Sequence, residues 1–185
     1  MSVEQIALVV TVALALIGYV VKYLNDLRLA VRKDQLDRVN RQLSDLYGPL
    51  FALDAVGSRL WREFRAGFRP DPAGPLTRDE AATWRLWMTA VFMPLHRQMK
   101  ELIVDNADLL RESGEMPDSL LDLCANVAGW ELTAERWRTG DFDPLDTGTT
   151  LVNYPRDVLT PYLKNAYREL KAEQGRLLRA LRLPS

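Results

Sequence analysis

The feature that most constrains this chain is an uncharged, apolar run near its N-terminus, Ile6–Val21. Lys22 can extend its stem along apolar surface, so the run reaches Leu24 and forms a helix of about 28 Å at about 1.5 Å per residue. That length is close to the ~30 Å hydrocarbon core of a bilayer. The run therefore predicts a transmembrane anchor over residues 1–24.

The flanking residues disfavour two alternatives. A cleaved signal peptide requires positive charge before its apolar region, but Glu4 is the only charged side chain there. The cleavage-like Ala13-Leu14-Ala15 lies inside the run rather than after it. A buried helix of a soluble core would need a polar face, which the run lacks.

Basic residues set the orientation of the predicted anchor. No Lys or Arg precedes the run, and Lys22, Arg28, Arg32 and Lys33 follow it closely. The positive-inside rule then places the long C-terminal part in the cytoplasm. The lone cysteine, Cys124, is compatible with that reducing compartment.

Residues after the anchor show helical periodicity. Residues 22–46 contain neither Gly nor Pro, and their apolar positions recur mostly at helical spacing, which predicts a juxtamembrane stalk over 25–47. Gly48-Pro49 predicts a break, because the residue before a proline resists helical geometry. A second helix is expected from Pro49 to about Ala66.

Further helices are predicted from their start and stop signals. Residues 67–76 are rich in Pro and Gly and predict a loop. A Thr77–Glu80 capping box opens a helix that runs toward Arg111, with a kink or junction at Pro94 and a stop at Gly114. Pro117 starts the next helix and Gly140 caps it. A polar loop over 141–154 then leads to a last helix from about Pro155.

No period-2 strand pattern is visible. The sequence therefore predicts an all-α chain, with one transmembrane helix continuing into a cytoplasmic bundle of about four or five helices over residues 48–185.

Two charged segments are candidate interaction surfaces. Between 101 and 122 there are seven acids and one base, and from 156 to 185 there are seven bases and three acids. The candidates are Glu101, Asp105, Asp108 and Glu112, expected on one helix face, and Lys164, Arg168, Lys171, Arg176, Arg179 and Arg182. These rows could also be solvated faces, or faces paired with each other in the fold.

Two alternative functions use the same residues. Glu101, Asp105 and Asp108 could hold a metal ion in an enzyme, and Arg176, Arg179 and Arg182 could bind nucleic acid or anionic lipid. The net charge of −1 disfavours nucleic acid, and a single histidine does not supply a multi-histidine metal site. We therefore expect no cofactor, and binding is favoured over catalysis.

The remaining chemical candidates have structural interpretations. His96 has no sequence-visible nucleophile or orienting partner, and Cys124 lies in an apolar helical stretch. The spacing of the tryptophans, Trp130 and Trp137 among them, indicates shared helix faces and favours packing. Stacking on nucleic-acid bases or anchoring of a partner is the alternative, and the faces that carry Trp130 and Trp137 are included among the candidate interaction surfaces.

Several short motifs carry a resemblance. They are Leu46-Tyr47-Gly48-Pro49-Leu50, the stretch 102–110, Asn153-Tyr154-Pro155, and Trp137 ahead of Gly140-Asp141-Phe142. In these the chain resembles a group of uncharacterised bacterial proteins with one N-terminal membrane helix and a helical cytoplasmic domain. The resemblance implies this architecture in the bacterial inner membrane and supplies no activity.

We therefore expect a single-pass protein whose helical domain is an interaction or scaffold module. Its expected partners are the lipid bilayer and a protein that the sequence does not identify. Self-association through the stalk stays open.

Overall fold

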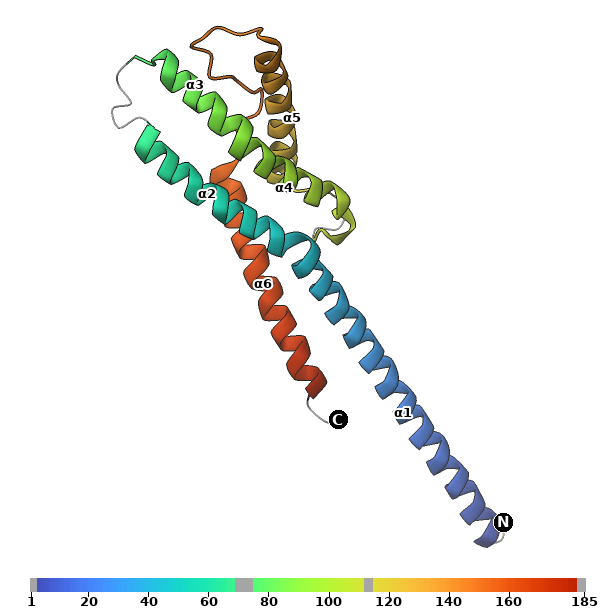
Figure 1. The fold of residues 1–185 in the computed structure, drawn as a ribbon. Coiled ribbons are helices and arrows are strands. Elements are labelled where there is room, and N and C mark those ends of the chain that lie inside the picture. Colours follow the sequence, from blue (N-terminus) through green and yellow to red (C-terminus); the bar gives the residue numbers. More distant parts are fainter. Residues whose placement is uncertain (1–2, 69–74, 112–114, 183–185) are drawn as a thin grey trace. The chain divides into compact units, whose positions relative to one another are not determined.

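The computed structural model describes residues 3–68, 75–111 and 115–182, with side chains from Leu14 to Leu181 within these ranges. Every regular element among them is helical, which confirms the all-α prediction. The elements are α1 (Val3–Arg41), the π-helix η1 (Gln42–Tyr47), α2 (Gly48–Phe68), α3 (Arg78–Trp87), the π-helix η2 (Met88–Phe92), α4 (Met93–Asp105), the 3-10 helix η3 (Ala107–Leu109), α5 (Asp118–Thr139) and α6 (Arg156–Arg182) (Figure 1).

The chain divides into two compact units. The first contains residues 1–40 and 172–185, and the second contains residues 41–171. In the first unit α1 contacts the C-terminal part of α6, where Gln174 Nε2 donates a hydrogen bond of 2.7 Å to Asn40 Oδ1. The division of the sequence into 1–24, 25–47 and 48–185 stays a prediction.

A transmembrane helix is not found among the described residues, since none of their helices is both long and apolar enough to cross a bilayer. The first half of the predicted span, residues 6–13, lies outside the residues whose side chains are described. From Leu14 to Leu24 the large apolar side chains are exposed.

The predicted helix break at Gly48-Pro49 is wrong. The chain stays helical there, and its turn widens to a π-helix. Gly48 N–H bonds to the carbonyl of Leu43, five residues back, and this closes the π-turn of η1. The wider turn accommodates Pro49, which has no N–H to donate to the preceding turn. A side chain at Gly48 would clash with the Leu43 carbonyl oxygen.

The η1 turn is also a packing element of the second unit. Leu46, Tyr47 and Leu50 are fully buried, and the buried amide of Gln42 donates through Nε2 to the carbonyl of Leu109 at 2.8 Å. The π-turn therefore places the start of α2 against the end of the α4 arm.

Helices α3 and α4 form one arm that runs beside α2 in the opposite direction (Figure 1). The Thr77–Glu80 capping box opens the arm as predicted, and η2 forms a junction directly before Pro94. The arm ends at Asp105 rather than at Arg111. Asn106 Nδ2 donates to the carbonyl of Leu102 at 3.1 Å, and η3 then buries Leu109. Gly114, the predicted stop, lies outside the described residues.

The last two helices begin and end close to their sequence signals. Pro117 precedes α5, and Gly140 ends it in a left-handed conformation with φ 78°. A connection without helix spans 141–155 and leads into α6, which contains Pro161. The predicted loop over 67–76 lies largely outside the described residues.

The upper core of the second unit is aromatic. Phe64, Met88, Phe92 and Trp137 are buried there, and partly buried aromatic side chains pack against them. Aromatic rings bury large areas and favour tilted or edge-on contacts, so a packed cluster of them holds α2, the α3–α4 arm and α5 together. Several side chains of this cluster, among them Trp61, Met88 and Phe92, also line a cavity.

Candidate binding site

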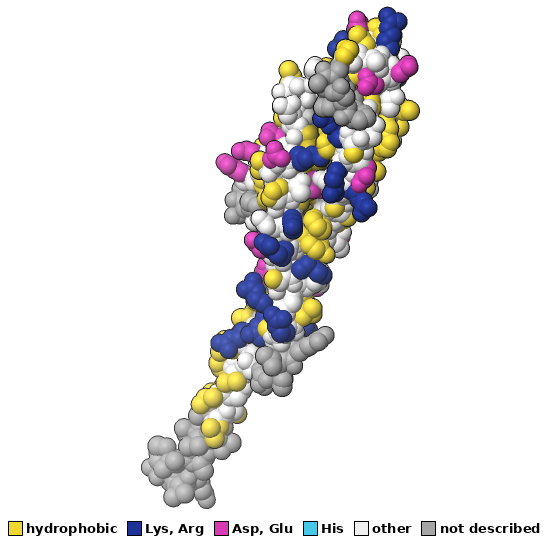
Figure 2. Space-filling view, turned by 90° about the vertical axis from the view of Figure 1, so that its left-hand side faces the viewer, with side chains coloured by type: hydrophobic (Ala, Val, Ile, Leu, Met, Phe, Trp, Pro, Cys, Tyr) yellow, Lys and Arg dark blue, Asp and Glu magenta, His cyan; other side chains and the backbone are white. Residues whose placement is uncertain are grey.

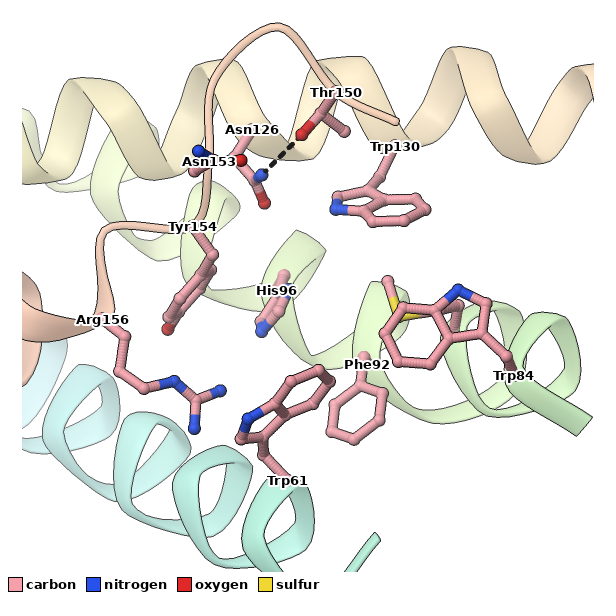
Figure 3. Close-up of a pocket in the computed structure, with 11 residues that line it drawn as sticks. Trp61, Trp84, Phe92, His96, Asn126, Trp130, Thr150, Asn153, Tyr154 and Arg156 are labelled. Carbon is pink, nitrogen blue, oxygen red and sulfur yellow. Dashed lines mark hydrogen bonds between the residues drawn. The ribbon is translucent and has the colours of Figure 1, made fainter. Parts of the chain in front are cut away.

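A cavity of about 310 Å³ lies inside the second unit. Its volume is at the lower end of the range for small-molecule sites. Six of its lining residues carry rings: Trp61, Trp84, Phe92, His96, Trp130 and Tyr154 (Figure 3). The others are Met88, Asn126, Thr150, Asn153 and Arg156.

The tryptophan side of the cavity is built from edge-on contacts. The ring of Trp61 meets Trp84 at 5.7 Å and 74°, and meets Phe92 at 5.6 Å and 73°. Because α2, α3 and η2 each supply one of these rings, the apolar wall depends on the packing of the helices.

His96 and Tyr154 form the middle of the cavity, with ring centroids 4.5 Å apart and planes at 20°. Burial and then the nearby positive charge of Arg156 lower the pKa of His96 to about 4. His96 is therefore neutral at pH 7. No hydroxyl or thiol of the described residues hydrogen-bonds to it, so its environment does not activate a nucleophile.

Behind Tyr154 lies a buried carboxyl group, Asp54, which is 2% exposed. Its Oδ1 accepts hydrogen bonds from Thr160 at 3.1 Å and from Tyr154 at 3.4 Å. Burial raises the pKa of Asp54, and the two hydrogen bonds partly oppose that rise. Burial also raises the pKa of Tyr154. Asp54 therefore positions Tyr154 but does not line the cavity.

Arg156 supplies the only formal charge among the lining residues at pH 7. Its guanidinium lies 5.1 Å from the ring centre of Trp61 and 5.8 Å from that of Tyr154. Both are cation–π distances. Among the described residues its guanidinium makes no hydrogen bond and no ion pair within 4 Å, and the Asp54 carboxyl interacts with it only electrostatically over a longer distance, so its N–H donors are available to a ligand.

Asn126 presents an unpaired acceptor. The residue is 1% exposed, and its Nδ2 donates to the carbonyl of Val152 at 2.7 Å and to Thr150 Oγ1 at 3.2 Å. A carbonyl only accepts, so these bonds fix which end of the amide is nitrogen. The other end, Oδ1, is buried with no hydrogen-bond donor among the described residues. Figure 3 shows this oxygen on the cavity side, away from Thr150.

The connection over 141–155 closes one side of the cavity and is held by side chains of α3 and α5. Trp84 Nε1 donates to the carbonyl of Thr147 at 2.7 Å, and Arg85 donates to the carbonyl of Asp146 at 2.8 Å. Trp137 Nε1 donates to Asp146 Oδ2 at 3.2 Å. These bonds give an irregular segment a fixed path, so Thr150, Asn153 and Tyr154 have defined positions.

The acidic candidate surface is not a single helix face. Because α4 ends at Asp105, Glu101 and Asp105 lie on a helix, whereas Asp108 lies in η3 and pairs with Arg41 at 3.5 Å. Glu112 lies outside the described residues. Within the described ranges no three His, Cys, Asp or Glu side chains are grouped to hold a metal ion.

The basic candidates of α6 are exposed where they are described, namely Lys164, Arg168, Lys171, Arg176 and Arg179, while the side chain of Arg182 lies outside the described residues. One ion pair between the two charged segments is Arg111–Glu169, at 2.6 Å. In it the base comes from the acidic segment and the acid from the basic one. Binding of a partner by either segment stays a prediction.

The two tryptophans proposed as a surface have other positions. Trp137 is 8% exposed within the aromatic core, so the prediction of a surface role for it is wrong. Trp130 is partly buried and lines the cavity. Their rings lie 5.9 Å apart, which agrees with the shared helix face and the packing role. Cys124 is half-buried, and burial raises the pKa of its thiol.

Sequence reasoning did not identify Asn126, Thr150, Tyr154 or Arg156 as site residues. One signal for them was present: Asn153-Tyr154-Pro155 stands directly before the last helix. Tyr154 and Arg156 stand at the end of a polar loop, from which their side chains can pack against the face of another helix. Nothing in the sequence, however, shows which face.

Comparison with protein-family models, with curated proteins and with solved structures finds no match for this chain. The resemblance to single-pass bacterial proteins therefore stays a prediction.

Proposed function

We propose that the chain is a membrane-tethered helical binding module, in which α1 attaches the protein to the bacterial inner membrane and the cavity of the second unit binds a small ligand. The observation that carries the binding function is the buried Asn126 Oδ1, an acceptor without a donor, facing a cavity of about 310 Å³. A buried polar atom without a partner costs about 1–3 kcal/mol. A ligand that donates a hydrogen bond to it would recover that free energy.

The tether is supported by the surface of α1. Leu14, Ile17 and Tyr19 are each about 60–70% exposed, and a run of such side chains is a surface that soluble proteins normally cover. Dark blue Lys and Arg side chains follow the yellow apolar stretch in Figure 2. This order agrees with a span followed by a cytoplasmic basic flank.

Binding fits the cavity better than catalysis does. His96 is the one candidate general base among the lining residues, and it stacks on Tyr154 instead of contacting a nucleophile. The metal-dependent alternative required Glu101, Asp105 and Asp108 on one helix face, but α4 ends before Asp108.

Binding can be tested by narrowing the cavity mouth. Asn153 is exposed and lines the cavity, so Asn153→Trp adds bulk at the mouth without changing the core. Leu151→Trp is the matched control, because Leu151 lies in the same connection, fully exposed and outside the lining. The full chain in nanodiscs is titrated with 3-methylindole, a neutral planar probe, by saturation-transfer NMR.

We expect transfer with the parent chain and with Leu151→Trp, and a loss of transfer with Asn153→Trp. Equal transfer in the two variants would contradict the binding function. The tether is tested separately by alkaline carbonate extraction of cell membranes. The full chain should stay in the membrane pellet, and a chain without residues 1–24 should not.

A further inference from the structure

The cavity carries a positive group and an unpaired acceptor on different walls, with aromatic rings between them (Figure 3). From this arrangement, and resting on the proposed binding function, we infer that the ligand is a planar aromatic acid that also carries an N–H or O–H donor. Its acid group faces Arg156 and its donor faces Asn126.

The charge of the cavity selects against cations. A cage of Trp and Tyr rings would by itself favour a cationic ligand. Here the guanidinium of Arg156 already lies over Trp61 and Tyr154, and no lining residue is acidic. The nearest buried acid, Asp54, is outside the lining and is hydrogen-bonded to Thr160 and Tyr154. A second cation would therefore be repelled, and an anion would be attracted.

The chemistry of Arg156 suits a carboxylate. A guanidinium offers five N–H donors in a planar fork, which matches the two oxygens of a carboxylate. Cation–π contacts with Trp61 and Tyr154 hold the guanidinium beside the cavity without using its N–H groups. A bidentate, charge-assisted pair can therefore form without breaking an existing bond.

The Asn126 amide determines the other end of the ligand. Its Nδ2 is used by the carbonyl of Val152 and by Thr150, so the amide cannot rotate to present a donor instead. The group that fills this position must therefore donate. A ligand with an acceptor there would leave two buried acceptors facing each other.

The aromatic walls determine the shape. Trp61, Phe92 and Trp130 come from three elements around a space of about 310 Å³. Flat, apolar surfaces on several sides favour a flat, apolar body, and the volume suits one or two fused rings better than a large cofactor.

Three probes separate these features. Indole-3-acetate has the ring, the acid and an N–H donor. 3-Methylindole lacks the acid, and 1-naphthaleneacetate lacks the donor. Dissociation constants are measured at pH 7 with the full chain in nanodiscs. We expect indole-3-acetate to bind about tenfold more tightly than 3-methylindole, and also several-fold more tightly than 1-naphthaleneacetate, as one charge-assisted and one neutral hydrogen bond predict.

Two arginine variants form a matched pair. Both Arg156 and Arg65 lie over Trp61, but Arg65, at 5.8 Å, is outside the cavity lining. Arg156→Gln should remove the preference for the acid, measured as the ratio of the dissociation constants of 3-methylindole and indole-3-acetate. Arg65→Gln should keep the preference. The inference is also lost if Arg65→Gln abolishes the preference as completely as Arg156→Gln does.

The outcomes distinguish the inference from the function on which it rests. If 3-methylindole binds as tightly as indole-3-acetate, the anionic ligand is wrong and the binding function stands. If 1-naphthaleneacetate binds as tightly as indole-3-acetate, the donor at Asn126 is wrong. If no probe binds, the binding function and the inference both fail.

Discussion

The ring of His96 stacks on the ring of Tyr154, with 4.5 Å between their centres and 20° between their planes, and the Tyr154 hydroxyl donates to the buried carboxyl group of Asp54. Three elements meet in this row: α4 through His96, the 141–155 connection through Tyr154, and α2 through Asp54. The row therefore couples a buried carboxyl group to the wall of the cavity.

Removing the two hydroxyls that hydrogen-bond to Asp54 should lower the free energy of unfolding, because the buried carboxyl group then lacks donors. Tyr154→Phe keeps the stack and removes the longer bond, so we expect a loss of up to about 1 kcal/mol in the free energy of unfolding. Thr160→Val removes the 3.1 Å bond and should cost about 1–2 kcal/mol. The double variant leaves Oδ1 without either donor and should lose more than the sum. Urea unfolding of all four proteins measures this, and simple additivity would show that the two bonds act independently.

Acid should destabilise the second unit through His96. The folded pKa of about 4 lies below the unfolded value of 6.5, so the unfolded chain binds the proton more readily. Above about pH 6.5 His96 is neutral in both states and does not lower the free energy of unfolding. As the pH falls from 6.5 toward 4, the free energy of unfolding decreases through His96 by on the order of 3 kcal/mol.

The control for this effect is His96→Gln, whose stability should change less over the same interval. Asp54 acts in the opposite direction, because its folded pKa is raised and its destabilising effect grows as the pH rises. It is present in both proteins, so the difference between their urea midpoints from pH 7 to pH 4 reports His96. Parallel curves for the two proteins would contradict the assignment.

Gly148 should tolerate no side chain. Its φ is 74°, and a Cβ would lie 2.6 Å from Thr133, 2.7 Å from Trp137 and 2.8 Å from Trp130. Gly148→Ala should therefore cost about 2–4 kcal/mol, from the left-handed backbone and from overpacking. Gly140→Ala has a similar φ of 78° with nothing near its Cβ, and should cost only about 1 kcal/mol. Equal losses in thermal unfolding would mean that the three contacts do not matter.

The π-turn of η1 should depend on Gly48. Gly48→Ala places a methyl group against the Leu43 carbonyl, so we expect a loss of about 1–3 kcal/mol. Gly67→Ala is the matched control on the same helix, because its Cβ would meet nothing within 4 Å. That change should stabilise α2 by about 0.5–1 kcal/mol through helix propensity. Opposite signs in denaturant midpoints confirm the prediction, and a neutral Gly48→Ala contradicts it.

Helix limits set by local chemistry were predictable from the sequence. The Thr77–Glu80 capping box, the Gly140 cap and the junction before Pro94 depend on residues within one or two turns, and each occurs where its motif stands. Two limits decided by tertiary packing were not predictable. The helix continues past Gly48 because a π-turn buries Leu46 and Tyr47, and α4 stops at Asp105 because η3 buries Leu109.

The candidate site was less predictable than the fold, since it is assembled from distant segments. Asn126 and Val152 are bonded across a loop, and Arg156 meets Trp61 from another helix. No spacing rule links such pairs. Charge runs are visible in a sequence because they are local, which is why the acidic and basic rows drew attention ahead of a cavity with a single charge.

One short connection supplies Thr150, Asn153 and Tyr154 to the cavity, while its path is fixed by bonds from Trp84, Arg85 and Trp137 on the surrounding helices. One part of the cavity lining is thus encoded apart from the helices that supply the rest of it. Selection could exchange the residues at 150–154 and alter what is recognised, while the helices that carry them keep their sequence and their packing.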